Sequence, residues 1–185
     1  MNLPLRLLVL VALLLATPFP GAHAAGGESE PASEPSTHLI LVRHAEKEAG
    51  GSDPGLTDGG QRRAEALVHL LQDHSVDRLL ASQFERTQAT LRPLAADREL
   101  TVIVSPIDRP LEEWAKRFAA QLVREYAGQT VVIAGHSNTT PLLGRALGAA
   151  IPDLDEAKDY DDLFWITLRD GEVELRHLHY GERSD

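Results

Sequence analysis

Two histidines follow apolar, strand-like runs in this chain. His44 comes after the run at 38–42 and Arg43, and His136 comes after a second run at 130–134. Because the carboxyl ends of parallel strands meet at one edge of an open sheet, residues remote in sequence can face one crevice there. The sequence therefore predicts a site that contains two imidazoles.

Two arginines accompany the histidines. Arg43 adjoins His44, and Arg86 lies just beyond a third strand-like run at 76–81. A guanidinium is permanently charged and offers parallel N–H donors in a planar fork, which suits the oxygens of a tetrahedral dianion. Two such groups beside two imidazoles predict a phosphate ester or a phosphoramidate as the substrate.

The elements that must position these residues follow from hydrophobic periodicity. Apolar runs alternate with segments of helical period, which predicts an α/β fold: a three-layer α/β/α sandwich with a mostly parallel, doubly wound sheet. The turn signal Asp170-Gly171 predicts an antiparallel C-terminal edge. We expect strands at 38–42, 77–81, 101–104, 130–134, 163–168 and 172–178, and helices at 58–73, 84–96, 111–126 and 139–148.

Two helix starts carry capping signals. Ser82 with Glu85 three residues later has the pattern of a capping box, which puts Arg86 in the first turn of its helix. Thr140-Pro141 pairs a capping residue with proline at the first helical position. Both helix starts are expected near the site, where their free N–H groups favour an anion.

The N-terminal segment is expected to lie outside the fold. Residues 1–24 have an apolar run at 7–16, two prolines, and a small-x-small pattern at 22–24, which together predict a cleaved signal peptide. A retained anchor is the alternative. The polar, proline-containing segment 25–36 predicts a flexible tether, and 37–185 the single domain. We therefore expect an exported protein, periplasmic or secreted.

Composition excludes several classes of partner and chemistry. The formal net charge of -10 argues against binding to nucleic acid or to an anionic membrane surface. The chain has no cysteine, which excludes disulfides and a cysteine-dependent phosphatase. After the leader no segment is apolar and long enough to span a bilayer. The oligomeric state stays open.

Four segments resemble, in order, the motifs of the histidine phosphatase superfamily, whose fold is phosphoglycerate mutase-like: 41–47, 56–61, 81–90 and 134–138. The likeness covers nearly the whole chain after the leader. Ala45 replaces a glycine that is common in the family, and no long insertion could form a lid. The chain is therefore more similar to the small, compact members, such as phosphohistidine phosphatases, than to mutases, which must shield an intermediate from water.

The resemblance implies a role for each residue of the constellation. His44 would be the nucleophile that becomes phosphorylated, and Arg43, Arg86 and His136 would form the phosphate pocket, without a metal or other cofactor. A neutral imidazole can attack phosphorus if a hydrogen bond to its other nitrogen fixes the tautomer. Asn138 is a further candidate for substrate binding, as a neutral donor.

A carboxyl group normally protonates the leaving alkoxide. The family places this acid between the second arginine and the second histidine, where the chain offers Asp108, Glu112 and Glu113. We favour Asp108, which follows the strand expected at 101–104, because the two glutamates look like first-turn residues that complement a helix dipole. A good leaving group would need no acid.

Other polar residues are expected to take no part in the chemistry. Glu46 and Lys47 are interpreted as an exposed pair, and Arg63 as a solvated helix residue. His177 and His179 alternate on one strand face and could bind a metal, but no third ligand stands at a convincing spacing, so we predict no metal site.

Two alternatives to a histidine phosphatase deserve comparison. A serine hydrolase is disfavoured because neither Ser82 nor Ser137 lies in a G-x-S-x-G elbow. A non-catalytic module that holds a phosphorylated ligand would use the same four residues, so this alternative stays open. The substrate could be a phosphorylated small molecule or a phosphoprotein.

Overall fold

The computed structural model describes residues 35–184. The predicted signal peptide, 1–24, lies outside the described residues, as does all but the last two residues of the predicted tether, 25–36. Within the described part of the chain, no helix is long and apolar enough to cross a membrane.

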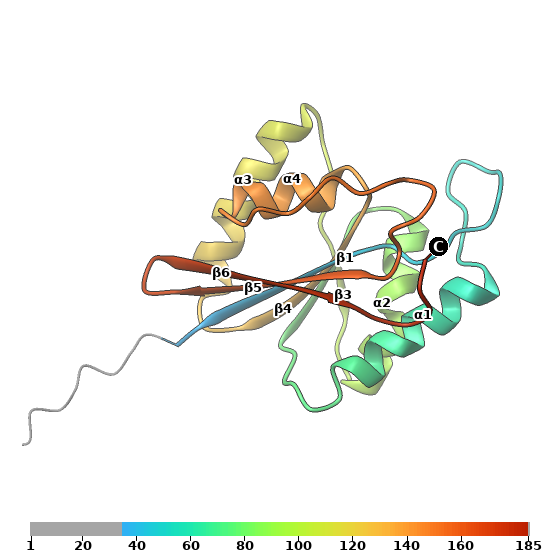
Figure 1. The fold of residues 1–185 in the computed structure, drawn as a ribbon, viewed down its shortest axis with the longest axis horizontal. Helices are drawn as coiled ribbons and strands as arrows, with labels where there is room; N and C mark the ends of the chain where they lie inside the picture. Colours follow the sequence, from blue (N-terminus) through green and yellow to red (C-terminus); the bar gives the residue numbers. More distant parts are fainter. Residues whose placement is uncertain (1–34, 185) are drawn as a thin grey trace, which may run out of the picture. The chain divides into compact units, whose positions relative to one another are not determined.

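A six-stranded sheet forms the middle layer, in the order β3-β2-β4-β1-β5-β6 (Figure 1). The first four strands in this order are parallel, whereas β5 pairs antiparallel with both β1 and β6. This confirms the mostly parallel sheet with an antiparallel C-terminal edge. The strands are β1 (Thr37–Arg43), β2 (Arg78–Ala81), β3 (Val102–Val104), β4 (Thr130–Gly135), β5 (Asp162–Arg169) and β6 (Glu172–His179).

Helices cover both faces of the sheet, as predicted. Figure 1 shows α3 and α4 on one face and α1 and α2 on the other. Leu39 and Leu41 of β1 pack in the apolar cluster with α3 and α4, and Ile40 and Val42 pack in the cluster with α1 and α2. Burial on both faces explains why β1 is an unbroken apolar run. The helices are α1 (Asp58–Leu70), α2 (Glu85–Asp97), α3 (Leu111–Glu125) and α4 (Thr139–Ala146).

The capping box predicted at the start of α2 is wrong. Phe84 is the N-cap residue and makes no side-chain cap. The Ser82 hydroxyl is engaged elsewhere, with His136 at 2.9 Å. Instead, the carboxylate of Asp53 accepts a hydrogen bond from the backbone N–H of Glu85, at 2.9 and 3.1 Å to its two oxygens. A residue distant in sequence therefore accepts a hydrogen bond from a free N–H of the first helical turn.

The cap predicted at Thr140 is also wrong. The N-cap of α4 is Asn138, two residues before Thr140, and the helix begins at Thr139. The Thr139 hydroxyl accepts from the backbone N–H of His136 at 3.0 Å, and the Thr140 hydroxyl donates to the carbonyl of Val42 at 3.5 Å. Both hydroxyls thus join the helix to the ends of β4 and β1, where the site lies.

The first turn of α1 packs against the loop that follows β1. A Cβ at Gly60 would lie 2.2 Å from the carbonyl oxygen of Glu46, whereas a Cβ at Gly59 would meet nothing closer than 3.6 Å. Gly60→Ala should therefore lower the free energy of unfolding by about 1–3 kcal/mol, because backbone would have to move. Gly59→Ala, the matched control, should be neutral or gain up to about 1 kcal/mol from helix propensity. Urea denaturation measures both variants, and equal stabilities would contradict this packing.

Candidate active site

The two predicted imidazoles lie at the ends of adjacent strands. Arg43 of β1 is paired with Gly135 of β4, so the next residue of each strand is a histidine. The rings of His44 and His136 are buried, with centroids 5.3 Å apart and an edge-on arrangement of 66°. The structure therefore brings together two residues that are separated by most of the domain's sequence.

A hollow of about 430 Å³ opens over these strand ends. Its size is in the range of small-molecule sites. It is lined by Asn138 and by all four residues of the predicted constellation. Lys47, which we did not expect in the site, lines it too. The lining residues are Arg43, His44, Lys47, Gln83, Phe84, Arg86, Ile107, Arg109, Leu111, His136, Ser137, Asn138, Thr139 and Glu156.

His44 has the tautomer that a nucleophile needs. Its Nδ1 lies 2.8 Å from the carbonyl oxygen of Ala45, which can only accept, so Nδ1 carries the proton and Nε2 keeps its lone pair. Burial, assisted by the charges of Arg43 and Arg86, lowers the pKa of His44 to about 4. The ring is therefore neutral at pH 7, with one nitrogen able to attack an electrophile.

His136 is held at both nitrogens. Its Nδ1 lies 3.4 Å from Nη2 of Arg86, which can only donate, so the ring proton is on Nε2, 2.9 Å from the hydroxyl of Ser82. Burial, followed by the charges of His44 and the two arginines, lowers the pKa of His136 to about 3. A bound dianion would have to raise this pKa before His136 could donate as an imidazolium.

A chain of hydroxyl groups fixes the His136 ring. The Ser82 hydroxyl lies 2.8 Å from that of Thr87, and the Thr87 hydroxyl donates to the carbonyl of Phe84 at 2.7 Å. With Nε2 of His136 as donor, each hydroxyl can accept one hydrogen bond and donate the next. Sequence analysis singled out Ser82, but for a helix cap, and it missed this role because the contact with His136 is tertiary.

Arg86 reaches the hollow from the first turn of α2, as expected. Its guanidinium lies over the Phe84 ring, with Cζ 4.5 Å from the ring centroid, and Nη1 is 3.5 Å from the carboxylate of Asp53. The buried Nε–H has no acceptor among residues 35–184. An unsatisfied buried donor is costly unless a ligand or water completes it. Arg86 lines the hollow, so its guanidinium charge is held where an anion would bind.

Arg43 is 1 % exposed and is fixed by the loop before β5. Its Nη atoms donate to the carbonyls of Asp155, at 2.9 Å, of Glu156, at 2.6 Å, and of Lys158. Its Cζ lies 3.8 Å from the centroid of the Tyr160 ring. Three of the five guanidinium N–H groups are thus used, and Nε–H, again buried, has no acceptor in the described chain.

The three candidate acids lie away from the hollow. Asp108 has a side chain that is 62 % exposed and pairs with Arg117 at 2.6 Å. Glu112 and Glu113 occupy the first turn of α3, as expected, and do not line the hollow either. Among the described residues, Glu156 is the acidic residue that lines it. No motif or spacing distinguished Glu156, because the loop before β5 has no periodic pattern.

Arg63, expected to be solvated, and Glu46, expected to be one half of an exposed pair, form a partly buried ion pair instead. Arg63 is 4 % exposed, and its Nε and Nη2 bind the carboxylate of Glu46 at 2.7–3.0 Å. Its Nη1 donates to the carbonyl of Tyr180 at 2.7 Å. This interaction joins the loop after His44 to α1 and to the end of the chain, so the interpretation of Glu46 and Arg63 as exposed was wrong.

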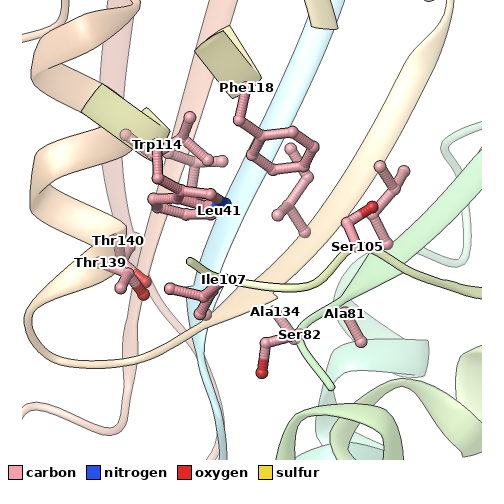
Figure 2. A pocket seen from close by; sticks show the side chains of 14 residues that line it. Leu41, Ala81, Ser82, Ser105, Ile107, Trp114, Phe118, Ala134, Thr139 and Thr140 are labelled. Carbon is pink, nitrogen blue, oxygen red and sulfur yellow. The ribbon is translucent and has the colours of Figure 1, made fainter. Parts of the chain in front are cut away.

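A second, apolar cavity lies next to the site, between the sheet and α3 (Figure 2). Its volume is about 20 Å³, which holds about one water molecule. Leu41, Trp114 and Phe118 form much of its wall, and Ile107 also lines the larger hollow. The cavity is too small for a substrate, and its apolar wall supplies the low-dielectric side of the site.

Comparison with known proteins finds similarity to one family. The sequence model of one family, the "Histidine phosphatase superfamily (branch 1)", matches residues 39–115, which include Arg43, His44 and Arg86. This segment of the chain is similar to that superfamily. It is 34 % identical over 98 residues to the adenosylcobalamin/alpha-ribazole phosphatase of Escherichia coli (strain K12), and the match spans 48 % of each chain, about half of that relative's length.

Solved structures share the fold over a larger part of the chain. The alpha-ribazole phosphatase of Shigella flexneri superimposes with a TM-score of 0.60 and 23 % identity, over 77 % of this chain and 96 % of that one. The protein histidine phosphatase SixA in complex with tungstate gives a TM-score of 0.52 and 17 % identity, over 77 % and 96 %. At such identities the likeness concerns the fold alone, which confirms the phosphoglycerate mutase-like architecture.

The two buried imidazoles should make the stability of the protein sensitive to acid. The folded-state pKa values of His44 and His136, about 4 and about 3, lie below the value near 6.5 of an unfolded chain. Below pH 6.5 the unfolded state therefore binds more protons, and stability falls as the pH falls towards 4. Each imidazole contributes a slope of up to about 1.4 kcal/mol per pH unit.

Urea denaturation between pH 7 and pH 4.5 measures this slope. In the double variant His44→Gln/His136→Gln, the free energy of unfolding should fall less steeply with decreasing pH than in the wild type. The control His69→Gln, which removes an exposed histidine on α1, should leave this slope unchanged. Parallel declines for the wild type and the double variant would contradict the assignment of two neutral, buried imidazoles.

Proposed function

We propose that this protein is an exported phosphatase that hydrolyses phosphomonoesters or phosphoramidates through a phosphohistidine on His44, without a metal. The observation that carries the proposal is the free Nε2 lone pair of His44 beside two guanidinium groups that keep unused donors. The family's activity supports the reaction class. The features of residues 1–24 support export.

In the first step, Nε2 of His44 attacks phosphorus while the bond from phosphorus to the leaving oxygen or nitrogen breaks. The unused donors of Arg43 and Arg86 bind the equatorial phosphoryl oxygens, whose charge they match without reorganisation. The carbonyl of Ala45 holds the Nδ1 proton and stabilises the charge that the ring acquires. The product is a phosphoimidazole and a leaving group that takes up one proton.

In the second step, water attacks phosphorus and the N–P bond breaks, so His44 regains its lone pair and inorganic phosphate leaves. His136 lies 5.3 Å from His44, centroid to centroid, and is placed to bind the same phosphoryl oxygens. A dianion beside His136 favours its protonated form, which would then donate through Nδ1, the nitrogen that faces Arg86. Asn138 lines the hollow and could bind an oxygen of the substrate.

Glu156 is our candidate for the acid, in place of Asp108. It lines the hollow, and its charge acts on Arg43, next to the nucleophile. Asp108 lines a different hollow, together with Trp114 and Arg117. An acid matters for a poor leaving group such as an alkoxide and hardly at all for p-nitrophenolate.

A small phosphorylated molecule is the substrate class that we favour. The hollow of about 430 Å³ is large enough for one, and a relative with the same fold is an alpha-ribazole phosphatase. The likeness to a protein histidine phosphatase supports phosphohistidine peptides as the second class. A screen of phosphorylated metabolites against phosphohistidine peptides distinguishes the two by turnover.

Turnover of p-nitrophenyl phosphate tests the catalytic assignment. His44→Ala should reduce kcat by at least about 1,000-fold, because the nucleophile is lost, and Arg86→Ala should reduce kcat/KM by at least about 100-fold. Arg92→Ala is the matched control, since Arg92 lies on the same helix but is exposed and pairs with Glu85. EDTA should leave the wild-type rate unchanged. Saturable phosphate binding without turnover of any ester would instead support a non-catalytic module.

Two carboxylate variants, each assayed on two substrates, test the acid. Glu156→Gln should lower kcat on an alkyl phosphate by at least about tenfold more than on p-nitrophenyl phosphate, because only the alkoxide needs a proton. Asp108→Asn, which removes an exposed carboxylate, should keep both rates. An Asp108→Asn enzyme that is selectively slow on the alkyl ester would restore Asp108 as the acid.

A further inference from the structure

The antiparallel pair β5 and β6 brings three possible metal ligands together on one face. Asp162 is paired with His179, and Phe164 with His177, so alternate residues of both strands share that face. Nε2 of His177 lies 2.6 Å from Oδ1 of Asp162, and Nδ1 of His179 lies 3.4 Å from the same oxygen. These three ligand atoms all lie within 4.8 Å of one another.

We propose that Asp162, His177 and His179 form a binding site for a divalent transition metal, with zinc as the reference ion. Sequence analysis identified the two histidines but no third ligand. The hairpin supplies it from the other strand, 15 residues from His177. Two imidazoles and one carboxylate are a donor set that zinc and related ions prefer, with a remaining position for water or another ligand.

The two separations that involve Asp162 are close to those around one small cation. Ligand atoms that are each about 2.1 Å from a tetrahedral zinc ion are about 3.4 Å from one another. The distance from His179 to Asp162 already has this value, 3.4 Å, and the distance of 2.6 Å from His177 to Asp162 is that of a hydrogen bond. If zinc replaced the proton shared by His177 and Asp162, their ligand atoms would have to move apart by roughly 1 Å or less.

The surroundings favour a fixed site that is open to solvent. The Asp162 side chain is 9 % exposed, whereas those of His177 and His179 are 38 % and 39 % exposed. The His177 ring stacks on Phe164, with centroids 4.6 Å apart and planes at 24°, which restricts its rotation. Asp161 places a second carboxylate oxygen 3.2 Å from Nδ1 of His179. Two anions and two imidazoles with an accessible side suit a cation from solution.

None of the three proposed ligands lines the catalytic hollow, and none is a proposed catalytic residue. His44 and His136 form the other histidine pair that could attract zinc, so the experiment has to distinguish the two pairs. The proposed phosphatase mechanism uses no metal, and failure of one proposal therefore leaves the other unaffected.

Isothermal titration of EDTA-treated, tag-free protein with zinc chloride tests the site. We expect one zinc ion per chain with a Kd of at most about 10 μM, and an increase in the melting temperature with zinc concentration. His177→Ala/His179→Ala should lose this binding, and Asp162→Asn should weaken it by more than about tenfold. His44→Gln and the surface control His69→Ala should bind zinc like the wild type.

Circular dichroism of each variant separates loss of a ligand from loss of the fold. If His177→Ala/His179→Ala is unfolded, His177→Gln alone, which can keep the hydrogen bond to Asp162, is titrated in its place and should weaken zinc binding by at least about tenfold. Wild-type protein that takes up no zinc at 100 μM, roughly ten times the expected Kd, would overturn the proposal. So would binding that is lost in His44→Gln but kept in the folded ligand variants.

Discussion

The parallel pairing of β1 with β4 is the constraint on which the site depends. It sets Arg43 opposite Gly135, and the residue after each becomes a histidine at the same edge of the sheet. Side chains alternate along a strand, so a register shift of one residue would turn these groups to the other face. The unbroken apolar runs that fix this register, buried on both faces, are thus also what positions the two imidazoles.

The surroundings of His44 and His136 bury both rings and hold two guanidinium groups in place. Burial keeps both imidazoles neutral, and the contacts of Nδ1 of His44 and Nε2 of His136 fix their tautomers. Loops that are distant in sequence hold the two guanidinium groups: Asp53 holds Arg86, and the carbonyls near Tyr160 hold Arg43. Each guanidinium keeps a buried Nε–H without an acceptor in the described chain. Both arginines line the hollow, and their charges beside the two imidazoles are how this geometry supports the proposed reaction.

Much of the fold could be predicted from the sequence, because its elements are encoded locally. The apolar run of β1 and the turn at Asp170-Gly171 predicted the sheet and its antiparallel edge. The strand-end rule predicted that His44 and His136 would meet. The capping box at Ser82 failed because a tertiary partner, His136, takes its hydroxyl. Local pattern cannot reveal such competition between partners.

The parts of the site that could not be predicted come from loops and cross-strand contacts. The contacts of Arg43 with the loop before β5 follow no periodicity, so Glu156 gave no signal. Asp108 was chosen because it follows a predicted strand, whereas Glu112 and Glu113 were assigned to the first turn of a helix. The burial of Arg63 depends on the chain end at Tyr180, 117 residues away. Asp162 becomes a neighbour of His177 only through the hairpin register, which places them on one face.

The central claim is that His44 carries the phosphoryl group between the two chemical steps. Rapid mixing with substrate, alkaline quenching and peptide mass spectrometry test it most directly, because phosphohistidine survives base but not acid. We predict one phosphoryl group per chain, located on His44, that forms before steady-state turnover and disappears when substrate is exhausted. Full turnover without a phosphorylated His44, or with the phosphoryl group on another residue, would contradict the account.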